Sequence, residues 1–198
     1  MKPHEGVREE YLRAFAEIAS RVAQTVKGTP PGALPIRMYV AGGAALHLMT
    51  GTRVSEDIDA VFSRRLILNE DVQVSYRDAD GRARLLYLDR NYNDTLGLLH
   101  ENAYEDSRVV EIPGVDAKSV EVRVLAPVDL AVSKLAHFSQ QDRADIELMA
   151  KEDLIDTASL RKRANEALTG YIGDLAGVRT SIDVACRLID SMRAPKAR

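Results

Sequence analysis

The part of the sequence best suited to chemistry is the stretch from Tyr39 to Ser63, YVAGGAALHLMTGTRVSEDIDAVFS. It holds two adjacent glycines, Gly42 and Gly43, and two aspartates, Asp57 and Asp59, separated by one isoleucine. Side chains two residues apart on a strand point to the same face, roughly 6–7 Å apart, so the aspartates would converge. Two convergent carboxylates repel unless a proton or a cation lies between them, and Mg²⁺ takes such oxygens alongside water and substrate phosphates. The pattern therefore predicts a Mg²⁺ site on a strand, with Mn²⁺ as the alternative ion.

The two glycines predict the other half of a nucleotide site. They lie between a predicted strand over Ile36 to Ala41 and a predicted helix over Ala44 to Met49. Without side chains, a triphosphate can approach the backbone N–H groups and the helix N-terminus. Each feature alone has a simpler interpretation, a tight turn for the glycines and a solvated strand face for the aspartates. Together, with 13 residues between Gly43 and Asp57, they favour a compact phosphoryl-transfer site.

The elements that must position these residues form an α+β pattern. The apolar spacing and the Gly, Pro and Asp-Gly breaks predict a helix over 7–27, strands over 36–41 and 55–62, a short helix over 44–49, a hairpin over 72–90 that turns at Asp80-Gly81, strands over 109–112 and 120–124, and helices over 128–138, 143–154, 158–172 and 182–192. This order predicts a mixed β-sheet core flanked by helices over residues 1–126. An α-helical C-terminal lobe over residues 127–198 would pack on it.

Composition indicates a folded cytoplasmic protein. Hydrophobic residues make up 45% of the chain and charged residues 29%, and there is one cysteine. No stretch approaches the ~20 apolar residues of a membrane helix, and the N-terminus has no apolar signal region, so no membrane partner is expected. The net charge is −3, divided into +4 for residues 161–198 and −7 for the rest. A basic tail is compatible with a phosphate-bearing partner or with an ordinary solvated helix.

Other chemistries are not indicated by the sequence. The four histidines have no metal-ligand spacing, and Cys186 lies in the apolar run IDVACRLI, which predicts a buried structural thiol. There is no P-loop and no G-x-S-x-G nucleophile motif.

Three motifs carry a family resemblance. A Gly-Gly pair, a short helix and an Asp-apolar-Asp strand resemble the signature of the nucleotidyltransferase superfamily with the DNA polymerase β-type core. The runs R-x-S-x-D-I-D (Arg53 to Asp59), P-x-D-L-A-x-x-K-L (Pro127 to Leu135) and R-x-D-I (Arg143 to Ile146) resemble its AbiEii/AbiGii toxin-like branch. The resemblance extends from residue 37 to about residue 150, and it implies a nucleotidyltransferase-type fold.

The resemblance also implies roles for individual residues. Those it assigns to nucleoside triphosphate (NTP) binding are Gly42, Gly43, Arg53, Ser55, Lys134 and Arg143. Those it assigns to catalysis are Asp57, Asp59, Lys134 and Asp145. Asp57 and Asp59 would hold Mg²⁺, Lys134 would reach the triphosphate from a helix, and Asp145 would act as a base or an orienting group.

A third carboxylate is needed for full two-metal chemistry. Glu121 in SVEVRVL is the preferred candidate, because its strand leads directly to the Lys134 helix and its side chain would share the sheet face of the aspartates. Glu111 in VVEIPG is the competitor, and a solvated, alternating edge strand is the other interpretation of the Glu121 segment.

The expected activity is transfer of a nucleoside monophosphate from an NTP to an acceptor hydroxyl. For the toxin-like branch the resemblance implies a tRNA 3′ end or a protein side chain as acceptor, and a cognate antitoxin as partner. Two alternatives stay open: an antibiotic-modifying nucleotidyltransferase, and a non-catalytic nucleotide- or partner-binding module of the same fold.

Overall fold

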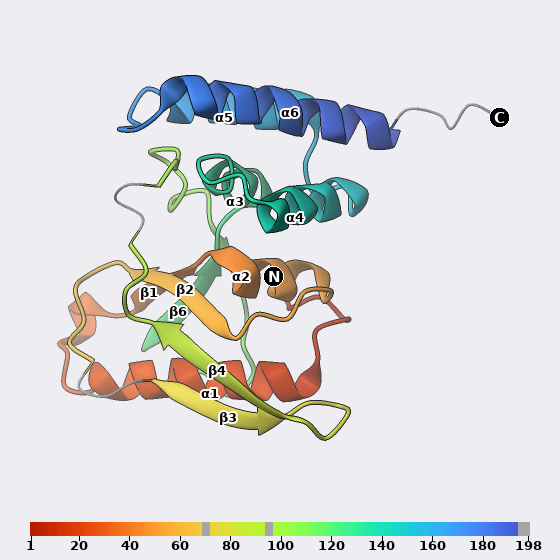
Figure 1. The fold of residues 1–198 in the computed structure, drawn as a ribbon. Helices are drawn as coiled ribbons and strands as arrows, with labels where there is room; N and C mark the ends of the chain where they lie inside the picture. Colours follow the sequence, from red (N-terminus) through yellow and green to blue (C-terminus); the bar gives the residue numbers. More distant parts are fainter. Residues whose placement is uncertain (69–71, 94–96, 194–198) are drawn as a thin grey trace. The chain divides into compact units, whose positions relative to one another are not determined.

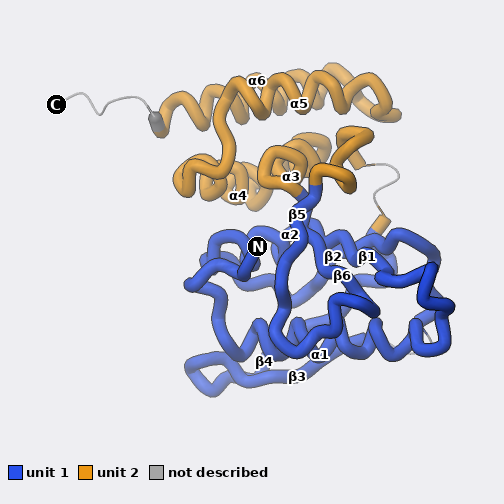
Figure 2. The backbone as a smooth tube through the Cα atoms, turned by 180° about the vertical axis from the view of Figure 1, so that it is seen from behind, with its two compact units in different colours: residues 1–92, 107–125 blue, residues 93–106, 126–198 orange. Residues whose placement is uncertain are grey.

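The computed structural model describes residues 1–68, 72–93 and 97–193, and it consists of two compact units. Unit 1 contains residues 1–92 and 107–125, and unit 2 contains residues 93–106 and 126–198 (Figure 2). The segment 93–106 therefore groups with the C-terminal helices, although it precedes the last two strands in the sequence. Within the described ranges, no helix is both long enough and apolar enough to cross a membrane.

Unit 1 is built on a mixed sheet of six strands (Figure 1). Its elements are α1 (Glu9–Thr25), the 3-10 turn η1 (Pro31–Ala33), β1 (Ile36–Val40), α2 (Gly42–Thr50), β2 (Asp57–Phe62), β3 (Gln73–Arg77), β4 (Ala83–Asp89), β5 (Arg108–Val109) and β6 (Val120–Val124). The strand order is β3-β4-β2-β1-β6-β5. β1 pairs with β6, and β2 with β4, in parallel, and the other neighbours are antiparallel. The predicted α+β class is confirmed.

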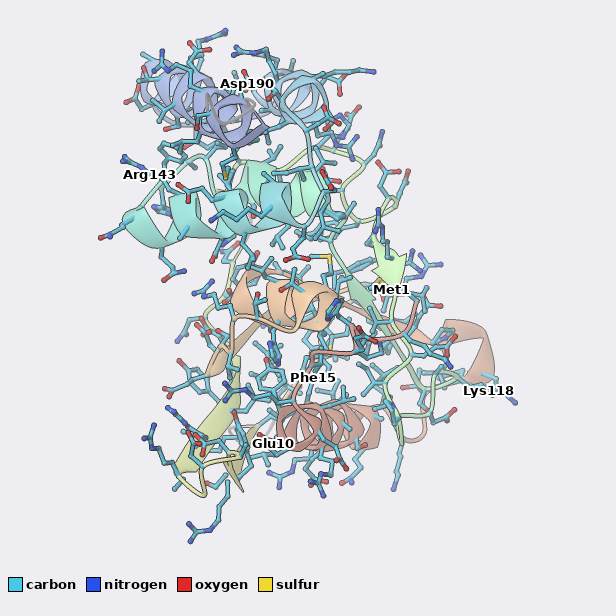
Figure 3. The ribbon with its side chains drawn as sticks, turned by 90° about the vertical axis from the view of Figure 1, so that its right-hand side faces the viewer. Met1, Glu10, Phe15, Lys118, Arg143 and Asp190 are labelled. Atoms are coloured by element: carbon cyan, nitrogen blue, oxygen red, sulfur yellow. The ribbon has the colours of Figure 1, made fainter. Side chains whose placement is uncertain are left out.

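The core of unit 1 lies between α1 and one face of the sheet. The inward face of α1 carries Tyr11, Phe15, Ile18 and Val22, all fully buried (Figure 3 labels Phe15). Burying an apolar side chain such as Phe15, Ile18 or Val22 stabilises the fold by about 1.5–3 kcal/mol. On the strands, every second residue faces this core, as the alternating burial of β2 and β6 shows. The remaining residues of these strands point to the opposite face, which carries the polar groups.

The β3–β4 hairpin is confirmed, with its turn at the predicted place. Gly81 has a φ of 78° and its N–H donates to the Asp78 carbonyl at 2.8 Å. The Asp78 carboxylate accepts from the N–H groups of Asp80 and Arg82 and forms an ion pair with Arg84 at 2.9 Å.

The strand predicted over residues 109–112 is shorter than expected. β5 contains only Arg108 and Val109. The Val110 N–H still donates to Val122, but the Glu111 N–H donates to the Met1 carbonyl at 2.9 Å. Met1 thus lies along the outer edge of this segment, because the backbone groups of alternate residues, Val109 and Glu111, face away from β6.

Unit 2 contains four helices in its described residues, and the helical pattern predicted from residue 127 is confirmed there. They are α3 (Pro127–Ser133), α4 (Gln140–Lys151), α5 (Thr157–Ala167) and α6 (Leu175–Arg193). Two of these helices have a capping box at the N-terminus, formed by Ser139 and Asp142 in α4 and by Asp156 and Ser159 in α5. The last helix begins seven residues earlier than predicted, and residues 194–198 of the predicted lobe lie outside the described residues. Cys186 on this helix is buried, as expected, and burial raises the pKa of its thiol.

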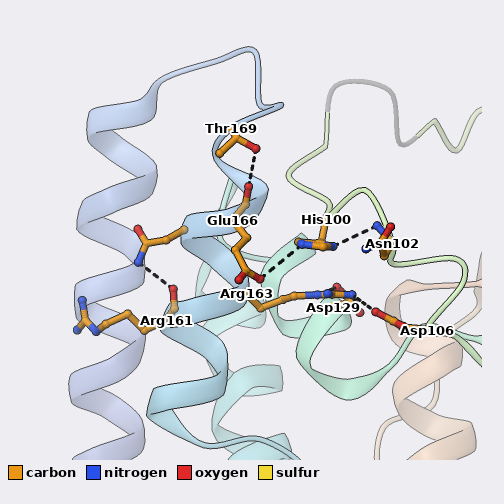
Figure 4. A network of polar contacts seen from close by, with 9 residues as sticks. His100, Asn102, Asp106, Asp129, Arg161, Arg163, Glu166 and Thr169 are labelled. Atoms are coloured by element: carbon orange, nitrogen blue, oxygen red, sulfur yellow. Dashed lines mark hydrogen bonds and ion pairs between the residues drawn. The ribbon is translucent and has the colours of Figure 1, made fainter.

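Segment 93–106 is tied to the helices of unit 2 by a polar network (Figure 4). The Arg163 guanidinium of α5 donates to both carboxylate oxygens of Asp129 at 2.7 and 2.9 Å, and to Asp106 at 2.5 Å. Glu166 lies 3.5 Å from the ring of His100. Asp129 is fully buried, so its pairing with Arg163 satisfies a charge that would otherwise destabilise unit 2.

Candidate active site

The start of α2 brings a glycine directly against an aspartate of the neighbouring strand. The Ala41 N–H donates to the Asp59 carbonyl at 2.8 Å, and the chain then turns into α2 at Gly42, which has a φ of 58°. A Cβ atom at Gly42 would lie 2.0 Å from Oδ2 of Asp59. Glycine is therefore required here for two reasons, the left-handed backbone and the close approach of a carboxylate.

The second glycine faces the loop that leads into β2. A Cβ atom at Gly43 would lie 2.8 Å from both Cβ and Oγ of Ser55, and 3.2 Å from Nη1 of Arg53. The serine hydroxyl in turn donates a short hydrogen bond to Oδ1 of Asp57. The structure thus brings together the four predicted binding residues of unit 1, Gly42, Gly43, Arg53 and Ser55, with both predicted catalytic aspartates.

Asp57 and Asp59 point to the polar face of the sheet, as predicted. Both are half-buried on β2, while Ile58 between them is fully buried in the core. The strand register places them beside Tyr87 and Asp89 of β4, respectively. The pKa of the Tyr87 phenol is raised above its ordinary value, first by the negative charge of Asp57 and then by burial, Asp89 and Asp59. This shift indicates a concentration of negative charge over β2 and β4.

Asp89 is the residue that the sequence analysis missed. It is half-buried on the sheet face of the two aspartates, one strand away from Asp59. The sequence feature that indicates Asp89 is the end of the hairpin, LLYLDR. Leu86 and Leu88 are buried there, and the strand ends at the acidic residue Asp89. Alternation alone marks many such acids, so only the pairing of β2 with β4 distinguishes this one.

The register separates Glu121 from the aspartates. As predicted, Glu121 shares their sheet face. It is paired with Arg37 on β1, whereas Asp59 accepts a backbone hydrogen bond from Ala41, four residues further along the same segment. Four residues along a strand are about 13 Å. Its carboxylate contacts Arg123 at 2.7 Å and Arg37 at 3.7 Å. The competitor Glu111 is exposed beyond the end of β5.

The donor set fits a Mg²⁺ ion held partly by substrate. Over residues 1–68, 72–93 and 97–193, no three His, Cys, Asp or Glu side chains lie close enough to hold a metal ion by themselves. Mg²⁺ is commonly bound by one or two carboxylates, with water and substrate phosphates completing its octahedron. Asp57 and Asp59 match this, and the space that a Cβ of Gly42 would fill lies against Oδ2 of Asp59.

The remaining predicted site residues belong to unit 2. The ammonium of Lys134, at the end of α3, lies 2.6 Å from Oδ2 of Asp145 and 3.6 Å from Asp142. Both Lys134 and Asp145 are buried, and Gln141 donates to the other oxygen of Asp145 at 2.9 Å. The guanidinium of Arg143 stacks over the Phe138 ring at 4.7 Å. The roles of Lys134, Arg143 and Asp145 toward a nucleotide stay predictions.

Removing the Lys134 charge should strongly destabilise unit 2. We expect Lys134→Met to lower the free energy of unfolding by about 3–5 kcal/mol, because the buried Asp145 carboxylate loses its counter-ion. Urea unfolding monitored by circular dichroism measures this. The double variant Lys134→Met/Asp145→Leu removes both charges and should be less destabilised than Lys134→Met alone. A single variant within about 1 kcal/mol of wild type would contradict the buried pair.

His47 should make the stability of unit 1 dependent on pH. It is fully buried on α2, with its ring edge-on to Tyr11 at 4.6 Å. Burial, and next the charge of Arg8, lower its pKa from 6.5 to about 4. Between pH 6.5 and pH 4, His47 binds a proton in the unfolded chain but not in the folded chain. The free energy of unfolding therefore falls as the pH is lowered over this range, by up to about 3 kcal/mol. Chemical unfolding at several pH values measures this.

The matched variant for this test is His47→Leu, which has no titrating group at the position. The difference in unfolding free energy between wild type and variant should change across pH 6.5 to 4 and be constant above about pH 7. A constant difference over the whole range would show that His47 is protonated equally in both states.

Fold and site together define a protein of the nucleotidyltransferase type: an α+β fold with a mixed sheet, a Gly-Gly helix start and an Asp-x-Asp strand beside it. The chain belongs to the family described as "Nucleotidyltransferase of unknown function (DUF6036)", whose model matches residues 18–177. The match includes every predicted site residue of both units. No curated protein and no solved structure matched the chain.

Proposed function

We propose that this protein is a Mg²⁺-dependent nucleotidyltransferase that transfers a nucleoside monophosphate from an NTP to an acceptor hydroxyl. The observation that carries the proposal is the contact between the α2 N-terminus and β2, where Gly42 has room for no side chain against Asp59. Phosphates at this helix start would meet backbone N–H groups on one side and the carboxylates on the other.

The reaction forms one bond and breaks one. The acceptor oxygen bonds to the α-phosphorus, the bond from this phosphorus to the bridging oxygen breaks, and pyrophosphate leaves with the bonding electrons. The acceptor proton passes to a carboxylate, and Asp89 is our candidate because it adjoins Asp59. The backbone N–H of Asn91 donates to one oxygen of Asp89 at 2.8 Å and so orients this carboxylate. Asp57 and Asp59 would hold Mg²⁺, which when bound supplies positive charge to the phosphates.

The toxin-like branch is the finer part of this proposal. It is supported by the resemblance of the runs from Arg53 to Asp59 and from Pro127 to Leu135 to the AbiEii/AbiGii proteins. In this form the acceptor is a tRNA 3′ end or a protein side chain, the protein acts in the cytoplasm, and a cognate antitoxin neutralises it. Induced expression in a bacterial host should then arrest growth, and the Asp57→Asn/Asp59→Asn variant should not.

The activity is tested by incubating the purified protein with Mg²⁺, each α-³²P-labelled NTP in turn, and total tRNA or cell lysate, followed by a denaturing gel. Label on an RNA or a protein band identifies the acceptor class directly. If no label is transferred with any of the four NTPs, although the protein binds them in calorimetry, the protein is a nucleotide-binding module and not a transferase.

A further inference from the structure

A basic cavity adjoins Asp89 at the end of β4. Its volume is about 330 Å³, and its lining includes Phe62, Arg64, Arg65, Asp89, Arg90 and Tyr92. A neighbouring cavity of about 460 Å³ shares Asp89 and Arg90 in its lining. All these residues belong to unit 1. Asp89 thus borders both the cavity and the acidic site on β2.

The lining of this cavity carries an excess of positive charge. Besides Arg90, which is engaged by other groups, it contains the guanidinium groups of Arg64 and Arg65 and the one carboxylate of Asp89. Arg64 and Arg65 are exposed, and neither forms an ion pair with a carboxylate in the described part of the chain. Arg90 is oriented by donating to the Leu68 carbonyl at 3.1 Å. Clustered cations repel one another, and an anion placed between them would relieve this repulsion.

Arginines elsewhere in the protein are used differently. Arg84, Arg123 and Arg163 each donate to a carboxylate within 3 Å and stabilise the fold. Since Arg64 and Arg65 have no such carboxylate among the described residues, a structural ion pair does not explain why they stand together. Arginine binds phosphate oxygens through two parallel hydrogen bonds, which makes phosphate the anion that such a cluster fits best.

The sheet order places this cavity and the α2 N-terminus on opposite sides of β2. β1, which leads into the α2 N-terminus, borders β2 on one side, and β4 with Asp89 borders it on the other. The α2 side is where the triphosphate of the nucleotide would lie, as the contact between Gly42 and Asp59 indicates. The arginine cavity lies on the β4 side of β2, and it extends from Asp89 to the carboxyl end of β2, where Ser63 donates to Arg37. An acceptor strand bound in this cavity would reach Asp59 by passing Asp89.

We propose that Arg64 and Arg65 bind backbone phosphates of a nucleic-acid acceptor and so lead its terminal hydroxyl past Asp89 to Asp59. This rests on the proposed nucleotidyltransferase function, and it names the acceptor as a nucleic acid. An unmodified protein acceptor carries no phosphate and would leave the cluster without a role.

The test is charge reversal at the two exposed arginines, Arg64→Glu/Arg65→Glu, with a fluorescein-labelled single-stranded RNA of about 12 nucleotides as probe. Fluorescence anisotropy at several salt concentrations gives the affinity. We expect the affinity to fall at least about tenfold at low salt. The slope of log K against log salt should decrease by about 1.4, because the variant no longer neutralises two phosphates of a single strand. The matched control Arg13→Glu/Arg82→Glu makes the same charge change at two other exposed arginines of unit 1 and should bind RNA nearly as wild type does.

Three outcomes would overturn the proposal. The first is that the wild type does not bind the RNA at low salt. The second is that the Arg64→Glu/Arg65→Glu variant binds the RNA as tightly as the control variant does. The third is that this variant loses Mg²⁺–NTP binding in calorimetry and keeps RNA binding. In the last case the arginines hold the triphosphate instead.

Failure of the proposed function is separately visible. The Asp57→Asn/Asp59→Asn variant should retain RNA affinity, because it changes no arginine of the cluster. RNA binding that depends on Arg64 and Arg65, in a protein that transfers no nucleotide to any acceptor, would support the phosphate cavity and reject the transferase.

Discussion

The double substitution Asp57→Asn/Asp59→Asn should reduce nucleotide transfer at least about 1000-fold, a loss of about 4 kcal/mol of transition-state stabilisation. The fold should persist or become slightly more stable, because two half-buried carboxylates on one strand no longer repel each other. Asparagine keeps an Oδ1 atom at position 57, so the hydrogen bond from Ser55 can remain. Labelled-NTP transfer and thermal unfolding, measured on the same preparation, separate chemistry from stability.

The matched control removes two exposed carboxylates from the same unit, in the variant Glu9→Gln/Asp80→Asn. Their side chains are 83% and 70% exposed, so this change should leave transfer and stability close to wild type. Normal transfer by the Asp57→Asn/Asp59→Asn variant would show that these two residues do not hold the metal ion. Equal losses in both variants would indicate a general effect of charge rather than a site.

The second large effect is expected for Gly42→Ala. The new Cβ atom would lie 2.0 Å from Oδ2 of Asp59, and the residue would have to keep a φ of 58°. The backbone strain costs about 1–2 kcal/mol. The clash must in addition move either the α2 N-terminus or the Asp59 carboxylate, so we expect transfer to fall by at least about 100-fold. Transfer rates and urea unfolding of the variant measure both effects.

Gly81→Ala is the control that isolates the strain. Gly81 has a φ of 78°, and nothing in the described structure lies within 4 Å of its added Cβ atom. It should therefore show the backbone cost without the clash, and its transfer rate should equal that of wild type. If both glycine variants lose the same stability and neither loses activity, the approach of α2 to Asp59 has no part in the reaction.

Local sequence patterns predicted the elements of the fold well. The apolar spacing of α1, the Asp80-Gly81 turn of the hairpin and the helical character after Pro127 each depend on neighbours within a few residues. The same holds for the site, where Asp57 and Asp59 share a face because strand side chains alternate. Gly51, with a φ of 70°, follows the last residue of α2 for a similarly local reason.

Which further acid lies beside Asp59 could not be decided from local patterns. Glu121 and Asp89 both stand on alternating strands and both share the face of Asp59, so periodicity does not distinguish them. The parallel pairing of β2 with β4 places Asp89 next to Asp59, while the register of β1 and β6 places Glu121 about 13 Å further along. Strand pairing is a contact between segments remote in sequence, and no short window contains it.

The sequence by itself thus determined the elements, the facing pair Asp57 and Asp59, and the glycines beside them, since each follows from backbone geometry over a few residues. Only the tertiary structure decided that Asp59 touches Gly42, that Asp89 joins the acidic face, and that Lys134 is held by Asp145. These contacts form when distant segments pack, because burial of the core and the hydrogen bonds of the sheet fix one register among many that the local patterns allow.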